Sequence, residues 1–583
     1  MTGPTLRILL LAHAFNGLTQ RVFVELAQAG HEVTVELDIH DDVSIEAVAL
    51  ARPDFVIAPY LKRRIPEAIW RSVRTIVLHP GPKGDRGPSA LDWAVLIGER
   101  RWGVTAFQAD GEFDAGDIWA SAEFDLRETS KASLYRVEVT ELAAKLVAEV
   151  VARAAAGDFA PEPLDYNRAD VWGRARPPMR QPERAIDWQL DDMATIVRKI
   201  RSADGAPGVA DRWLGEDLHI FGGHPERELA GPAGALLGKR DEALCRACAD
   251  GAVWVTHGRK RPSPEKPSLK LPLDRVLGER AESIPELEAP FTTRDGTWQE
   301  LGYEEDGAVG FLRFDFHNGA MSTGQATRLL AAYRRARERP TRVLVLTGGA
   351  DFFSNGLHLN VIEHAASAAD ESMRNIEAID NVVKEILETT SHLTISAIGG
   401  NAGAGGVFLG LAADYVFCRD GVVLNPHYKN MGNLYGSEYW TYVLRRRLQL
   451  VGDLDTHPQV RAVMGRRLPM GAREARALGL IDEVIDGPRR AFDQAIRTRA
   501  AELAASPTLE DALADKRDSR ARDEREKPLH RYRDEELARM HENFYGFDPS
   551  YHVARYNFVF KVPHSRTPLH LAAHRQKTWG RPR

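Results

Sequence analysis

The chain has 583 residues, and its hydrophobic content of 43% is enough to bury several cores. Its 77 basic and 83 acidic residues are interleaved and leave a net charge of -6, a pattern that gives no basic footprint for nucleic acid. No run approaches the roughly 18 apolar residues of a membrane span, and a total of three cysteines is typical of the reducing cytoplasm. We therefore expect a cytoplasmic multidomain enzyme whose partners are neither nucleic acid nor membrane.

Residues 6–12 and 54–60 are short, nearly continuous apolar runs and predict buried strands of a parallel α/β sheet. A further strand ends at His79, because Pro80 follows directly and stops the chain from entering a helix. Ligand sites of such sheets lie at the carboxyl ends of the strands. We therefore expect the His79 imidazole to point into a cleft at that edge.

A second loop, with Asp114 followed by Gly116, offers a carboxylate that can fix the tautomer of His79 and prepare it to shuttle a proton. Either motif alone is as readily an ordinary turn. In this order, however, the two resemble the folate-dependent formyltransferases, which carry an Asn-x-His-Pro loop followed by an Asp-x-Gly loop. The resemblance covers about residues 5–165 and implies N10-formyl-tetrahydrofolate as the formyl donor. It also implies that the folate site includes Tyr60, Pro80, Gly81 and Gly116.

The chain departs from this family at Val77, where the family has the Asn that helps to hold the formyl oxygen. An oxyanion needs a hydrogen-bond donor, so another side chain must supply it. We expect Asn16, or His13 in the same loop, to take that role.

Beyond a Pro- and Arg-rich connection at residues 173–183, short strands at 218–221, 234–237 and 252–256 predict a small β-barrel. Two segments here, RAIDW and IRSADGAPG, resemble the carboxy-terminal OB-like domain of methionyl-tRNA formyltransferases. A tRNA-binding role would need a basic surface, and the charge pattern gives none, so a substrate-facing lid or spacer is the preferred role of this domain. Cys245 and Cys248 have no second Cys/His pair at metal spacing, so no metal site is expected.

The second half contains two glycine-bearing segments, at residues 350–359 and 397–417. Such glycines let two backbone amides converge at the starts of helices, where unsatisfied N–H groups favour negative charge. Both segments, in order, resemble the two signatures of the crotonase superfamily over about residues 300–500. The resemblance implies a coenzyme A thioester whose oxygen binds the amides of Leu357 and Gly405, beside Gly356 and Gly406.

The two glutamates of the superfamily's hydratases are absent, because Phe408 and His427 stand at the matching positions. Hydration of a double bond needs two carboxylates, so a hydratase is disfavoured. Nearby candidates are His427, Tyr428, Tyr435 and Glu438. Tyr435 and Glu438 are three residues apart and are expected to share one helix face, although each of these side chains could instead serve packing or a surface ion pair.

A formyltransferase-like half joined to a crotonase-like half resembles, along nearly the whole chain, the hydrogenase maturation proteins of the HypX (HoxX) family. The resemblance implies a role in making the carbon monoxide ligand of the iron in nickel-iron hydrogenases, with other maturation proteins as possible partners. Our hypothesis is that formyl passes from N10-formyl-tetrahydrofolate to coenzyme A, and that Glu438, assisted by Tyr435, takes the formyl proton as carbon monoxide leaves. Three alternatives stay open: formyl transfer to another acceptor, formyl-CoA hydrolysis, and a second half that only binds coenzyme A as a scaffold.

The expected fold is therefore a multidomain α/β protein with a Rossmann-like formyltransferase domain, an OB-like β-barrel, and a crotonase-type spiral β/α domain with a helical C-terminal tail. An aromatic cluster between residues 545 and 560 is expected to pack against the crotonase-like half. The predicted boundaries are 1–170 for the formyltransferase-like domain, 171–275 for the barrel, 276–298 for a linker, 299–505 for the crotonase-like domain and 506–583 for the helical extension.

Overall fold

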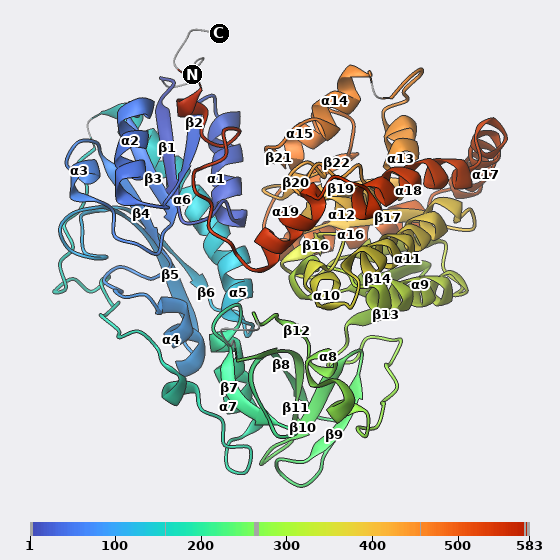
Figure 1. Cartoon of the computed structure of the whole chain (residues 1–583), viewed down its shortest axis with the longest axis horizontal. Helices are drawn as coiled ribbons and strands as arrows, with labels where there is room; N and C mark the ends of the chain where they lie inside the picture. The colour runs from blue at the N-terminus through green and yellow to red at the C-terminus, as the bar shows by residue number, and fades with distance from the viewer. Residues whose placement is uncertain (1–3, 158, 262–266, 455, 577–578, 580–583) are drawn as a thin grey trace. The chain divides into compact units, whose positions relative to one another are not determined.

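The computed structural model describes residues 4–157, 159–261, 267–454, 456–576 and 579. The chain forms two compact units, whose helices and strands are drawn in Figure 1. Clusters of buried apolar side chains lie within each unit. The first comprises Met1–Ser263, Pro272–Pro285 and Pro563–Arg583, and the second comprises Pro264–Leu271 and Glu286–Val562.

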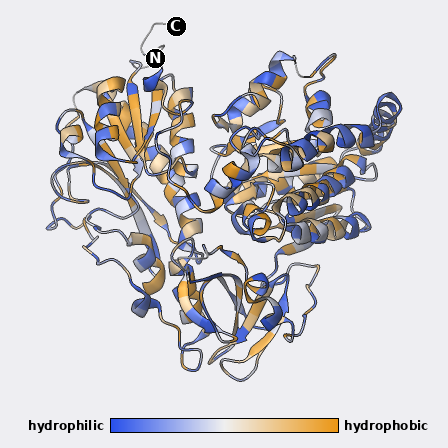
Figure 2. Ribbon diagram, in the orientation of Figure 1, coloured by the Kyte–Doolittle hydropathy of each residue, from blue (hydrophilic) through white to orange (hydrophobic). Residues whose placement is uncertain are grey.

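The first unit begins with a sheet of strand order β2-β1-β3-β4-β5-β6, in which the first four strands are parallel and the last two antiparallel. Its strands are β1 (Arg7–Ala12), β2 (Glu32–Leu37), β3 (Phe55–Tyr60), β4 (Thr75–His79), β5 (Arg101–Gln108) and β6 (Ile118–Asp125). Its helices are α1 (Gly17–Gln28), α2 (Asp41–Ala51), α3 (Glu67–Trp70), α4 (Ala90–Ile97), α5 (Lys131–Leu134) and α6 (Thr140–Ala156). Figure 2 shows mostly hydrophobic strands and flanking helices of mixed character, as expected when both sheet faces are covered.

The second part of this unit is a curved antiparallel sheet of order β7-β8-β11-β10-β9, whose path is open. The strands are β7 (Val209–Trp213), β8 (Glu216–Glu226), β9 (Leu236–Arg240), β10 (Ala243–Ala247) and β11 (Ala252–Lys260). The helices α7 (Met193–Ala203) and α8 (Leu273–Leu277) pack on it. The strands expected at 218–221 and 252–256 fall within β8 and β11, and the one at 234–237 overlaps β9. Both Cys245 and Cys248 are buried thiols.

The second unit contains two sheets, of order β13-β14-β15-β17-β19-β22 and β16-β18-β20-β21. The strands are β13 (Leu301–Asp306), β14 (Val309–Phe314), β15 (Val343–Thr347), β16 (Phe352–Ser354), β17 (Leu393–Ile398), β18 (Asn401–Gly403), β19 (Tyr415–Arg419), β20 (Val423–Asn425), β21 (Met470–Gly471) and β22 (Glu483–Ile485). The helices are α9 (Thr323–Arg337), α10 (Leu359–His364), α11 (Ala368–Glu388), α12 (Gly405–Leu411), α13 (Trp440–Arg447), α14 (Pro458–Met464), α15 (Ala472–Ala477), α16 (Arg489–Ala504), α17 (Leu509–Glu526), α18 (Leu529–Tyr545) and α19 (Ser550–Val559). One large apolar core joins α9, α11, α12, α13 and α18.

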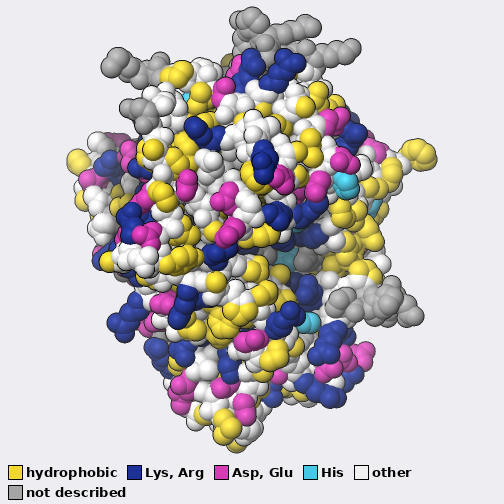
Figure 3. Space-filling model, turned by 90° about the vertical axis from the view of Figure 1, so that its left-hand side faces the viewer, with side chains coloured by type: hydrophobic (Ala, Val, Ile, Leu, Met, Phe, Trp, Pro, Cys, Tyr) yellow, Lys and Arg dark blue, Asp and Glu magenta, His cyan; other side chains and the backbone are white. Residues whose placement is uncertain are grey.

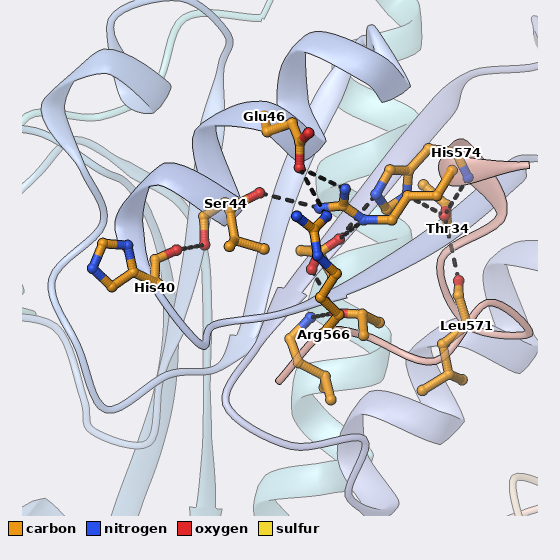
Figure 4. Close-up of polar contacts among 12 residues, drawn as sticks. Thr34, His40, Ser44, Glu46, Arg566, Leu571 and His574 are labelled. Atoms are coloured by element: carbon orange, nitrogen blue, oxygen red, sulfur yellow. Dashed lines mark hydrogen bonds and ion pairs between the residues drawn. The ribbon is translucent and has the colours of Figure 1, made fainter. Parts of the chain in front are cut away.

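The region expected to be a single helical extension divides instead into two parts. Helices α17 to α19 belong to the second unit, whereas residues 563–583 return to the first unit. Figure 4 shows His574 and Leu571 of this tail bound to Thr34 of β2, the strand at the sheet edge. The expectation for the aromatic cluster is only partly met, since Tyr551 is buried in the core of the second unit but Phe547 and Phe558 are exposed.

The surface carries mixed charge, as the composition indicated. On the face shown in Figure 3, acidic and basic side chains are scattered among one another. Among the helices in the described part of the chain, none combines the length and the apolar character needed to cross a bilayer.

Candidate functional site

His79 is the last residue of β4, and its buried imidazole lies between two carboxylates. Its Nε2 is 2.9 Å from Oδ2 of Asp85, and its Nδ1 is 3.7 Å from Oδ1 of Asp114. The structure thus brings together the predicted pair of His79 and Asp114, and adds a second acid that the sequence analysis missed. An imidazole held in this way has a fixed orientation and can pass a proton.

The hydrogen bond expected from Asp114 is made by Asp85. The Asp85 side chain is fully buried, and a guanidinium nitrogen of Arg176 lies 3.8 Å from its other oxygen. Gly81 leaves room for this arrangement, since a β-carbon there would lie 2.6 Å from both the Asp85 carboxylate and the His79 ring. The signal that could have found Asp85 is its place between two glycines in the loop that follows the predicted His79 strand.

The Asp114 loop is held by backbone geometry. Asp114 has a left-handed backbone (φ 52°), and the amide of Gly87 donates to its Oδ2 at 3.1 Å. A β-carbon at Gly116 would overlap the carbonyl oxygen of Gln108. Gly81 and Gly116, which we predicted as folate-site residues, are required by the packing of the two loops.

The remaining predicted residues of this site lie at the ends of neighbouring strands. Val77 packs against an apolar core cluster, so it cannot replace the family's amide. Tyr60 ends β3, beside β4 in the sheet, and its ring contacts that of His13 at 6.0 Å between centroids. Asn16 caps α1, because its Oδ1 accepts from the backbone N–H of Thr19 at 3.0 Å. That cap uses the carbonyl oxygen, and the side-chain NH2 of Asn16 is the donor that an oxyanion would need.

In the second unit, the amides of Leu357 and Gly405, which we predicted to bind the thioester oxygen, belong to two loops that pack against each other. Gly356 has a left-handed backbone (φ 71°), and a β-carbon there would lie 3.5 Å from the amide nitrogen of Gly405. Leu357 forms a bridge with Met321 that uses the carbonyl of Gly356 and the amide of His358. The amide of Leu357 itself therefore points away from Met321. Gly405 is the first residue of α12, where an N–H group has no partner within the helix.

Glu438 lies directly on this pair of loops. A β-carbon at Gly405 would overlap its carboxylate, so only glycine admits Glu438 there. The Tyr428 hydroxyl donates to Oε2 of Glu438 at 2.7 Å. The ring of Tyr428 stacks on Phe408, with centroids 5.9 Å apart and planes 13° from parallel. Phe408, which stands where the hydratases have a glutamate, thus supports the tyrosine that binds Glu438.

Burial is the main influence on the pKa of the Glu438 carboxyl group. Glu438 is 1% exposed, and burial, reinforced by the charge of Asp380, raises its pKa to about 8 despite the hydrogen bond from Tyr428. A carboxylate with such a raised pKa is a stronger base than one in water, which suits the removal of a proton from carbon.

Two expectations about this segment are corrected. Residues 435–438 are not helical, since α13 begins only at Trp440 and Glu438 has a left-handed backbone (φ 59°). Tyr435 therefore does not share a helix face with Glu438; its ring packs on Trp440, beside a cavity of about 410 Å³. The phenol that binds Glu438 is Tyr428. His427 is buried near the start of the loop that follows β20.

Comparisons with known proteins find relatives for both the formyltransferase-like and the crotonase-like half of the chain. The sequence model of the enoyl-CoA hydratase/isomerase family matches residues 307–546, and that of the formyl transferase C-terminal domain matches residues 178–265. The hydrogenase maturation factor HoxX of Bradyrhizobium diazoefficiens is 53% identical over 579 residues, which is 99% of each chain. The crystal structure of HypX from Aquifex aeolicus in complex with tetrahydrofolic acid is 47% identical, with a TM-score of 0.94 over 98% of this chain and 99% of that chain. A methionyl-tRNA formyltransferase of Chloroflexus aurantiacus is 30% identical over 208 residues, 34% of this chain and 64% of that enzyme.

The fold and the two sites define a multidomain α/β protein that joins a formyltransferase-type half to a crotonase-type half. The chain belongs to the HoxX (HypX) family of hydrogenase maturation factors. The resemblance inferred from the sequence is thereby confirmed.

Proposed function

We propose that this protein makes carbon monoxide for the iron centre of a nickel-iron hydrogenase in two consecutive reactions. Formyl is first transferred from N10-formyl-tetrahydrofolate to the thiol of coenzyme A. Formyl-CoA is then split into carbon monoxide and coenzyme A. The observation that carries the proposal is the Glu438 carboxylate, which lies on Gly405 at the start of α12 and is bound by Tyr428.

In the first reaction, the thiol sulfur attacks the formyl carbon and the folate nitrogen leaves. The proton lost by sulfur must reach that nitrogen, and the His79 imidazole is the group that carries it, oriented by Asp85. Asp114 stabilises the imidazolium from the other side. The folate assignment is supported by the Aquifex aeolicus relative, whose crystal structure contains tetrahydrofolic acid.

In the second reaction, the amides of Leu357 and Gly405 hold the formyl oxygen. Glu438 takes the formyl proton while the carbon–sulfur bond breaks, so that carbon monoxide leaves and the sulfur departs as thiolate. The proton on Glu438 then returns to sulfur, and the sum is formyl-CoA giving carbon monoxide and the free thiol. A formyl C–H is a weak acid, which is why a buried base of raised proton affinity is needed.

The test supplies the full chain with N10-formyl-tetrahydrofolate and coenzyme A and measures free tetrahydrofolate and carbon monoxide together. We expect both to form in equal amounts. Glu438→Gln should stop gas release and leave tetrahydrofolate formation in place, whereas His79→Ala should stop both. Formate in place of carbon monoxide would show hydrolysis, and carbon monoxide from Glu438→Gln would refute the role of that residue.

A further inference from the structure

Three carboxyl groups from three elements meet inside the second unit. Asp380 lies on α11, Glu438 precedes α13, and Glu536 lies on α18; each is at most 1% exposed. The hydroxyl of Ser437 lies between two of them, 2.8 Å from Oδ2 of Asp380 and 3.3 Å from Oε2 of Glu536. Since a buried charge without partners is costly, the three groups cannot all be ionised, and the hydrogen bonds indicate which one is.

Asp380 has the environment of an ionised carboxylate. Its Oδ1 accepts the backbone N–H of Glu438 at 2.8 Å, its Oδ2 accepts the Ser437 hydroxyl, and a guanidinium nitrogen of Arg533 lies 3.7 Å away. Burial raises its pKa to about 6, held there by Arg533 and these hydrogen bonds. At neutral pH, Asp380 is therefore mostly charged.

Glu536 has the environment of a neutral acid. Its Oε1 accepts from the amide of Thr441 at 2.9 Å and also from the hydroxyl of the same residue. Ser437 has one hydroxyl proton and cannot donate it fully to both carboxyl groups, and its contact with Glu536 is the longer of the two. The distances therefore favour Asp380 as the acceptor of this proton and Glu536 as the protonated acid. Burial, with the charge of Asp380, raises the pKa of Glu536 well above its ordinary range.

We propose that Asp380 is a positioning residue for carbon monoxide release, which fixes the Ser437–Glu438 backbone and, through its negative charge, sets the proton affinity of Glu438. This inference rests on the function proposed above. It assigns no proton transfer to Asp380. The proton still moves from the formyl carbon to Glu438 and from Glu438 to the thiolate sulfur.

The negative charge of Asp380 matters for carbon monoxide release because Glu438 must both take the formyl proton and return it to sulfur. A free thiol has a pKa of about 8.5, close to the pKa of about 8 to which burial and Asp380 raise Glu438. A weaker base would remove the formyl proton too slowly, and a stronger one would not release it to sulfur. The groups that face Glu438 are Asp380 from α11, Glu536 from α18 and the Tyr428 hydroxyl.

The experiment compares Asp380→Asn with Glu536→Gln in the full chain supplied with formyl-CoA, measuring carbon monoxide release from pH 6 to 10. Asparagine keeps the acceptor for the Glu438 amide but removes the charge, so the midpoint should fall by about one pH unit and the rate at high pH should fall several-fold. Glutamine replaces a neutral acid of the same shape, so Glu536→Gln should leave the midpoint in place. A lower rate at every pH with an unmoved midpoint in Asp380→Asn would reduce Asp380 to a structural role and overturn the inference. An equal shift in both variants would overturn it as well.

Two further measurements keep the test decisive. Carbon monoxide release by the unaltered protein separates the two proposals, because its absence refutes the proposed function, whereas unchanged profiles in the variants refute only the role of Asp380. If Asp380→Asn does not fold, infrared spectra of the unaltered protein, Glu438→Gln and Glu536→Gln identify the protonated carboxyl groups directly. We expect each exchange to remove one carboxylic acid band at pH 7; an ionised Glu438 at pH 6 would contradict the inference.

Discussion

At the residue scale, the first site depends on Asp85. It is Asp85, not the predicted Asp114, that hydrogen bonds to His79. Exchange of the aspartate in a Ser-His-Asp triad for asparagine costs about 10⁴-fold because the wrong tautomer is held. Asparagine in place of Asp85 should likewise hold the His79 imidazole in the wrong tautomer.

We expect Asp85→Asn to slow the formation of tetrahydrofolate by at least about 100-fold. Asp114→Asn, the matched control, should slow it less, because its oxygen is 3.7 Å from the ring nitrogen. Steady-state rates of tetrahydrofolate release measure both effects. Equal losses in the two variants would contradict the assignment of the tautomer to Asp85.

A second residue-scale prediction concerns pH. The pKa of Glu438 is raised to about 8, so its basic form is scarce at pH 6 and abundant at pH 10. Carbon monoxide release from formyl-CoA should therefore increase with pH and reach half of its maximum near pH 8. Tyr428→Phe removes a hydrogen bond that lowers this pKa, so its midpoint should lie higher. A flat profile between pH 6 and 10 would show that another group accepts the proton.

At the scale of elements, the start of α12 is built around glycine. A β-carbon at Gly405 would overlap the Glu438 carboxylate, which is fixed by Tyr428 and by the backbone contact with Asp380. Gly405→Ala should therefore displace Glu438 and reduce carbon monoxide release by at least about 100-fold, as expected for a disturbed catalytic geometry. Tetrahydrofolate formation should be unchanged. Gly452→Ala, at a glycine with open space around it and a left-handed backbone (φ 90°), controls for general effects of the exchange, including backbone strain.

Much of this architecture could be predicted from the sequence, because local patterns determine it. The strand that ends at His79 follows from the proline after it, and the loops at Gly356 and Gly405 follow from their glycines. Such features depend on a few adjacent residues.

The contacts that the sequence did not indicate are those between distant positions. The partner of Glu438 was expected three residues away at Tyr435, but Tyr428 reaches it because residues 435–438 form a loop and not a helix. Asp380 and Glu536 are 58 and 98 residues from Glu438 in the chain, so only the packing of α11 and α18 brings them together. Spacing along the chain carries no information on such pairs.

At the scale of the whole molecule, the chain returns to its first unit after passing through the second. The tail covers the exposed edge of β2, because the amide of Val35 donates to the carbonyl of Leu571 and that of Leu37 to the hydroxyl of Thr567. An uncovered edge strand offers unpaired amides to other chains. The tail also binds the buried Glu36 through His574, Thr567 and Arg575. Figure 4 shows His574 of this group beside Thr34.

Truncation after Val562 should destabilise the first unit alone. It removes the two hydrogen bonds from the backbone amides of Val35 and Leu37 and a charged cluster, which together contribute roughly 3–5 kcal/mol. We expect a lower unfolding temperature, a greater tendency to aggregate and loss of tetrahydrofolate formation. Release of carbon monoxide from supplied formyl-CoA should persist, because α17 to α19 remain in the second unit. Loss of both activities together would show that the second unit depends on the tail.

The tail should also make the stability of the first unit sensitive to acid. Burial raises the pKa of Glu36, but hydrogen bonds from His574, Thr567 and Arg575 outweigh burial and hold the pKa below its ordinary value of 4.5. The stabilisation is therefore complete above that value and is lost as the pH falls through the lower pKa of the folded state. Glu36→Gln removes the charge while keeping the shape, so its unfolding free energy should be lower at pH 7 and should decline less between pH 5 and 3. Denaturant unfolding of the full chain and of the variant at each pH measures the difference, and parallel curves would exclude Glu36 as the acid-sensitive group.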